Sequence, residues 1–80
     1  MKKRVFAFVA KSGERVHISQ ERIAQIRVRD FLMRIFLDDG AHSLIVTFSD
    51  RDSAKIARMR IDAGESVSPI HCETADFVKI

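Results

Sequence analysis

The sequence predicts an α+β fold, with an antiparallel sheet of four to five strands and one main helix. Two β-rich stretches are each followed by a glycine-containing turn and a second β-rich stretch, which is the pattern of a β-hairpin. A later segment, residues 51–63, has apolar residues at helical spacing, and a short β-rich stretch ends the chain. Two hairpins, a helix and a C-terminal strand in 80 residues indicate a single domain over residues 1–80.

The first hairpin is expected from residues 4–10 and 15–19, with Gly13 in its turn. A two-residue loop at Ser12-Gly13 predicts three cross-strand pairs: Val9 with Val16, Ala7 with Ile18, and Phe8 with His17. Ser19 can then cap a short helix over Gln20–Ile26, because Glu21 follows near the positive end of that helix.

The second hairpin has the clearest pattern in the chain. Val28–Leu37 is expected to be one long strand, Asp39-Gly40 a type I′ turn, and His42–Phe48 the returning strand. This loop predicts four cross-strand pairs: Phe31 with Phe48, Met33 with Val46, Ile35 with Leu44, and Leu37 with His42. A slip of one residue would scatter the apolar side chains between the two faces of the sheet, so the turn and the apolar pattern indicate the same register.

The main helix is expected to begin after Ser49 or Asp50 and to end near Ala63, before Gly64. Its main apolar stripe consists of Ala54, Ala57 and Ile61, and a weaker apolar arc consists of Ile56, Met59 and Ala63. A loop that contains Pro69 follows, with a short strand within Val67–Cys72 as an alternative for part of it, and Asp76–Ile80 is expected to be the last strand.

The sequence favours a cytoplasmic location. Cys72 is the only cysteine, so it cannot form an internal disulfide, whereas small secreted domains usually depend on disulfides. The start Lys2-Lys3-Arg4, followed by apolar residues, resembles the beginning of a signal peptide. The apolar run has only six residues, which is too short for a signal peptide or a membrane span, so we expect no membrane partner.

Catalytic and metal chemistry have little support. A nucleophilic Cys72 would need a nearby base, but adjacent residues in a strand point to opposite faces, so His71 is poorly placed to activate it. His17 and His42 lack the close spacing of zinc ligands, and the chain has no phosphate-binding or serine-hydrolase motif. We expect no catalytic residues, no metal and no cofactor; a minor enzyme or metal protein that uses His71 or Cys72 is the third hypothesis.

Basic residues support a second hypothesis, a small nucleic-acid-binding protein. Residues 1–34 carry nine lysines and arginines against three acidic residues, whereas residues 35–80 carry five against eight. This asymmetry fits either pairing between the two halves or an acidic partner, protein or nucleic acid. The candidate contact residues lie on the long strand and on one helical face: Arg27, Arg29, Arg34, Arg51, Lys55 and Arg58.

Apolar residues support the preferred hypothesis, because they exceed what one helix can cover. The first and third strands are apolar on both faces, whereas a single amphipathic helix covers one side of a sheet. The candidate second face consists of Phe6, Phe8, Leu32, Phe36 and Ile45. Either the sheet curls into a partial barrel over this face, or another protein chain covers it. We therefore expect a non-enzymatic protein-binding or self-associating module, with another protein, above all a second copy in a homodimer, as its partner.

Overall fold

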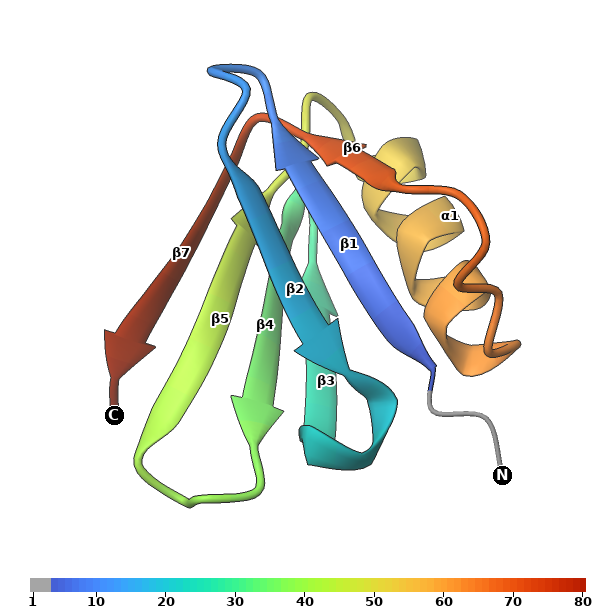
Figure 1. Ribbon diagram of the computed structural model, residues 1–80. Helices are drawn as coiled ribbons and strands as arrows, with labels where there is room; N and C mark the ends of the chain where they lie inside the picture. Colours follow the sequence, from blue (N-terminus) through green and yellow to red (C-terminus); the bar gives the residue numbers. More distant parts are fainter. Residues whose placement is uncertain (1–3) are drawn as a thin grey trace.

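The computed structural model describes residues 4–80, so Lys2 and Lys3 of the signal-like start lie outside the described residues. Figure 1 shows an α+β fold with antiparallel sheets, which confirms the predicted class. The elements in chain order are β1 (Val5–Ala10), β2 (Arg15–Ser19), the 3₁₀ turn η1 (Gln20–Arg22), β3 (Ile23–Arg29), β4 (Leu32–Leu37), β5 (His42–Thr47), α1 (Arg51–Asp62), β6 (Ile70–Cys72) and β7 (Thr74–Lys79).

These strands form two sheets that face each other, with strand orders β2-β1-β6 and β3-β4-β5-β7. Neighbouring strands are antiparallel, except that β6 runs parallel to β1. The chain passes from β6 in one sheet to β7 in the other at Glu73, whose N–H donates to the Thr47 carbonyl at 2.7 Å and whose carbonyl accepts from the N–H of Lys11. The described strands therefore enclose a core between two open sheets and do not close into a barrel.

One hydrophobic core joins the two sheets and α1. The helix closes the side of the core next to β3 and contributes its predicted stripe, Ala54, Ala57 and Ile61, which is buried. The weaker arc of the helix is not covered, because Ile56 and Met59 are exposed. The largest fully buried apolar side chains come from both sheets: Phe6, Phe8, Met33, Ile35, Leu44 and Val46.

The predicted register of the first hairpin was wrong by one residue. Phe8 pairs with Val16 and Phe6 with Ile18, because the N–H of Ala10 donates to the Glu14 carbonyl at 2.8 Å and three residues, 11–13, rather than two lie between the paired positions. With this register all four paired side chains lie on one face and are buried. Burial of a continuous apolar face therefore decides the register against the shorter loop.

The segment before the second hairpin also differs from the expectation. The short helix at Gln20–Ile26 is wrong, because only η1 is helical and the chain continues as β3. The long strand expected at Val28–Leu37 is broken at Asp30, which has a φ of 55° and turns β3 back onto β4. Alternation explains the extra strand: Ile26 and Val28 are partly buried, while the arginines between and after them are exposed.

The second hairpin has the predicted register, with Met33 opposite Val46 and Ile35 opposite Leu44. Its turn is not type I′, because that turn needs positive φ at both central residues and only Gly40, with a φ of 70°, has it. The Asp39 carboxylate instead accepts hydrogen bonds from the N–H groups of Ala41 (2.8 Å) and His42 (3.0 Å). These bonds, together with one to the His42 ring, lower the pKa of Asp39 to about 2.

Replacing Gly40 with valine is expected to destabilise the protein by about 1–2 kcal/mol, because a β-branched residue resists positive φ. An added Cβ at Gly40 would meet nothing within 4 Å, so the cost is conformational. Urea unfolding measures the change, and Ala41→Val at the exposed neighbouring position is the control. Equal stability of Gly40→Val and Ala41→Val would show that the turn does not need glycine.

The boundaries of α1 agree with the sequence. The Asp50 carboxylate accepts from the Ser53 N–H at 2.7 Å, which lowers the pKa of Asp50, and Gly64 follows the helix with a φ of 71°. The short strand considered within Val67–Cys72 is present as β6, and the last strand, β7, begins two residues earlier than expected. Within residues 4–80, no helix combines the length and the hydropathy needed to cross a membrane.

Candidate interaction surface

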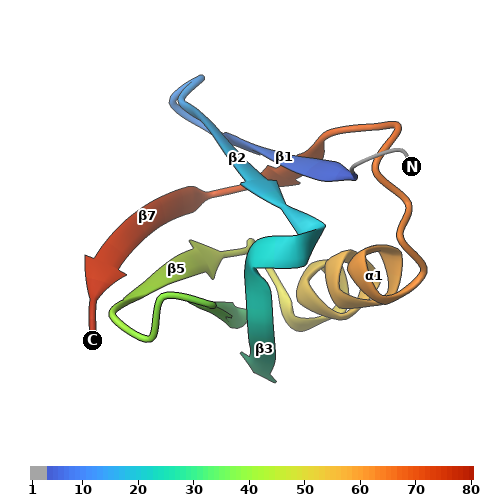
Figure 2. The same ribbon diagram turned by 60° about the horizontal axis from the view of Figure 1, so that its bottom comes forward.

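The four-stranded sheet has one face in the core and one face that points away from it, called here the outer sheet face. In Figure 2 the three-stranded sheet and α1 lie on the core side, and no helix or strand of residues 4–80 covers the other side. Cross-strand pairing arranges the outer sheet face in three rows, each running from β3 through β4 and β5 to β7: Gln25, Phe36, Ser43, Val78; Arg27, Arg34, Ile45, Asp76; and Arg29, Leu32, Thr47, Thr74.

Three of the five predicted apolar partner residues lie on this face. Leu32 is exposed, and Phe36 and Ile45 are half-buried among their neighbours on β4 and β5. Arg34 lies on β4 between Leu32 and Phe36: its Nε donates to the Ser43 hydroxyl at 3.1 Å, and its guanidinium carbon is 5.1 Å from the centre of the Phe36 ring. The two central strands of the face thus carry apolar side chains interspersed with polar ones, and the position of the Arg34 cation among them is fixed.

The placement of Phe6 and Phe8 with this group was wrong. Both side chains are buried in the core, at 1% and 0% exposure, opposite the inner face of the four-stranded sheet. The prediction assumed that all these strands share one sheet, so that the same inward and outward alternation applies to each of them. In the structure β1 belongs to the second sheet and faces the first one. The chain itself therefore covers this part of the apolar excess.

The basic residues predicted on the long strand also lie on the outer sheet face. Arg27 and Arg29 are exposed on β3, and Arg34 lies beside Arg27 on β4. Among residues 4–80, neither Arg27 nor Arg29 forms an ion pair, and the exposed Asp76 carboxylate on β7 forms none either. The face is therefore positive along β3 and β4 and negative at β7.

The predicted basic residues of the helix lie elsewhere and are largely engaged within the chain. Arg51 is 3.7 Å from the Asp30 carboxylate, and Arg58 pairs with Asp62 at 3.1 Å. The Arg58 guanidinium also donates to the Ile26 carbonyl at 2.9 Å, which ties the helix to the edge of β3. Lys55 is exposed. The two groups of basic residues therefore do not form one continuous surface.

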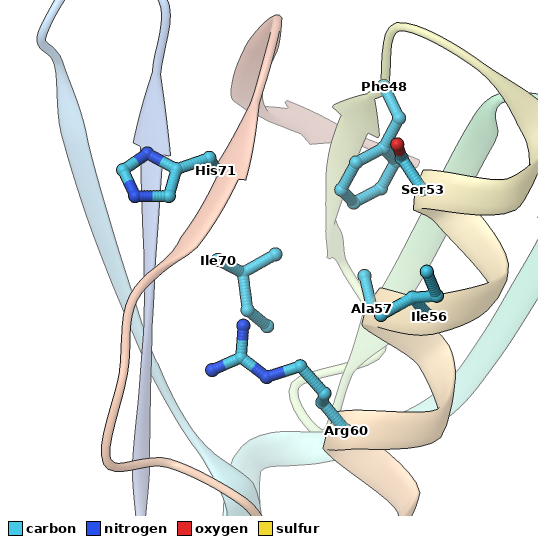
Figure 3. A pocket seen from close by; sticks show the side chains of 7 residues that line it. All are labelled: Phe48, Ser53, Ile56, Ala57, Arg60, Ile70 and His71. Carbon is cyan, nitrogen blue, oxygen red and sulfur yellow. The ribbon is translucent and has the colours of Figure 1, made fainter.

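A hollow of about 180 Å³ lies between α1 and β6 and is lined by Phe48, Ser53, Ile56, Ala57, Arg60, Ile70 and His71. Figure 3 shows Ile70 and the Arg60 guanidinium at its centre, while the His71 ring points away from the other side chains. The Arg60 guanidinium donates to the carbonyls of Ser68 and Pro69 and thereby holds the loop after the helix. The Arg60 charge is therefore used to position this loop.

His71 and Cys72 lie on opposite faces of β6, as expected. His71 is exposed, whereas Cys72 is buried and its thiol donates to the Val9 carbonyl at 3.6 Å. Desolvation, and then the charges of Glu73 and Asp76, raise the pKa of the Cys72 thiol, which disfavours the nucleophilic thiolate. No group of three or more histidine, cysteine, aspartate or glutamate residues within 4–80 is arranged to hold a metal ion.

Sequence reasoning missed half of the outer sheet face: Gln25, Ser43, Thr47, Thr74, Asp76 and Val78. The alternation of Asp76 and Val78 with Ala75 and Phe77 carries a weak signal, but only the pairing of β7 with β5 places these two beside Ile45 and Ser43. Comparisons with known proteins give no independent guide to function, because no protein-family model, curated protein or solved structure matches this chain.

Proposed function

We propose that this protein is a non-enzymatic binding module that holds another protein chain against its outer sheet face. One observation carries the proposal: Leu32, Phe36 and Ile45 share this face with three arginines, and no element among residues 4–80 covers it. Uncovered apolar side chains mixed with polar ones are typical of protein interfaces, and arginine is enriched in such interfaces.

A protein partner has more support than a nucleic acid. Single-stranded nucleic acids stack their bases on exposed aromatic rings, but the Phe36 ring already lies against Arg34, and no other aromatic residue shares the face. Arg51 and Arg58, which would supply further phosphate contacts, pair with Asp30 and Asp62. Nucleic-acid binding through the arginines of the face is the alternative, and crosslinking in cells distinguishes it from protein binding.

The proposal includes a cytoplasmic location and no catalytic role. The single cysteine supports the location, because the chain cannot form an internal disulfide. The buried Cys72 thiol, with its raised pKa, and the outward direction of His71 support the absence of cysteine catalysis.

Photo-crosslinking tests the proposal in cells that produce the protein. A benzophenone amino acid in place of Ile45 is expected to give a covalent adduct with a protein, because Ile45 lies at the centre of the face. The same group in place of Ile56 is the matched control, since Ile56 is exposed on α1, away from the outer sheet face. Mass spectrometry identifies what each position has captured.

Phe36→Lys in the same chain is expected to abolish the adduct at position 45 while the protein stays folded, because Phe36 lies outside the core. No adduct at position 45 above the level at position 56 would overturn the proposal. An adduct that nuclease removes would replace it with the nucleic-acid hypothesis, and reversing Arg27, Arg29 and Arg34 to glutamate would then abolish the adduct.

A further inference from the structure

The outer sheet face carries opposite charges at its two ends. Its middle row runs Arg27, Arg34, Ile45, Asp76, so the exposed Arg27 and Asp76 are three strands apart at the same height along the sheet. Neighbouring strands are about 4.8 Å apart, which separates the two backbones by roughly 14 Å. That distance is too large for an ion pair within one chain, and neither side chain has an ion-pair partner among residues 4–80.

We infer that the partner held by the outer sheet face is a second copy of this chain, docked about a two-fold axis that runs parallel to the strands. The inference rests on the proposed function. Such an axis places β3 over β7 of the partner subunit. Residues of one row therefore lie over residues of the same row in the other copy. Arg27 of one copy therefore lies opposite Asp76 of the other, and the symmetry makes this pair twice.

Charge selects this axis over the other two-fold axis that stacks the same faces. An axis perpendicular to the strands would place β3 over β3, and Arg27 and Arg34 would then face the same arginines of the partner. Both axes keep the strands of the two sheets aligned, which is the common way in which sheets pack face to face, so charge alone distinguishes them.

The apolar side chains on β4 and β5 fit the same arrangement. The axis passes between β4 and β5, so these two strands lie over β5 and β4 of the partner subunit and cover Leu32, Phe36 and Ile45 of both copies. Four strands of about six residues span roughly 20 Å by 20 Å, so each subunit contributes a face of about 400 Å². The total of roughly 800 Å² for two subunits is below the range of stable specific interfaces, so the dimer is weak and depends on concentration.

Two charge reversals, studied alone and mixed, test the inference. Arg27→Asp places aspartate opposite Asp76, and Asp76→Arg places arginine opposite Arg27, so each variant alone is expected to dimerise roughly tenfold or more weakly than the parent. In an equimolar mixture, the introduced aspartate of one variant faces the introduced arginine of the other, and the native Asp76 and Arg27 face each other. The mixture is expected to recover dimerisation close to that of the parent.

Sedimentation velocity at low salt and at high protein concentration measures the dimer. Both positions are exposed, so both variants are expected to fold, and Arg15→Asp on the exposed side of β2 is a control that should leave the dimer unchanged. Single variants that dimerise like the parent, or a mixture that stays monomeric, would overturn the paired arrangement. A parent that stays monomeric would overturn the second copy as partner, while a crosslink from position 45 to a different protein would leave the proposed function standing.

Discussion

Replacing Val46 with aspartate is expected to unfold the protein. Val46 is fully buried in the centre of β5, opposite Met33, so the new carboxylate would lie in the core without a partner. The expected loss is about 4 kcal/mol or more, which is comparable with the whole stability of a domain of this size. Circular dichroism and urea unfolding measure it.

Val67→Asp is the matched control, because Val67 is 94% exposed in the loop after the helix. The same substitution there is expected to change stability by less than about 0.5 kcal/mol. A Val46→Asp protein that melts like Val67→Asp would show that the register of β4 and β5, and with it the division into core and outer sheet face, is wrong.

Replacing Phe8 with alanine is expected to destabilise the protein by about 3–5 kcal/mol, because it leaves a cavity between the two sheets. Phe36→Ala removes the same ring from the outer sheet face and is expected to cost the monomer only about 1 kcal/mol, since that side chain is not part of the core. Urea unfolding at low protein concentration compares the two variants.

Assembly should respond in the opposite way to the two phenylalanine substitutions. Phe36→Ala is expected to weaken association, whereas the folded fraction of Phe8→Ala keeps an intact outer sheet face. If Phe8→Ala proved stable and monomeric while Phe36→Ala proved unstable, Phe8 would belong to the interaction surface and Phe36 to the core, which would contradict this assignment.

Local signals determined what could be predicted from the sequence. The register of β4 with β5 follows from Gly40 together with consecutive apolar pairs, and the limits of α1 follow from Asp50 and Gly64. In both cases the deciding residues are close in sequence to the structure that they specify. The β3–β4 turn was missed because Asp30 supplies its positive φ in place of glycine.

Long-range pairing determined what could not be predicted. Alternation indicated that Leu32, Phe36 and Ile45 share a face, but it could not show that β1 belongs to a different sheet and faces inward. The parallel pairing of β6 with β1 joins residues about sixty positions apart, and no nearby residue specifies it. The charge pattern of the outer sheet face depends on the pairing of β7 with β5, so the position of Asp76 on this face could not be predicted from the sequence.

Amide chemical shifts during dilution test most directly whether the outer sheet face is an interaction surface. Two-dimensional NMR spectra of labelled parent protein, recorded from about 1 mM to about 10 µM, cover the range in which a small interface dissociates. We expect concentration-dependent shifts at Arg34, Ile45 and Asp76 and their neighbours on the face, with β1, β2 and the exposed side of α1 unchanged. Shifts confined to β1, β2 or α1 would contradict the assignment of this surface, and spectra that do not change with concentration would contradict its closure by a second copy.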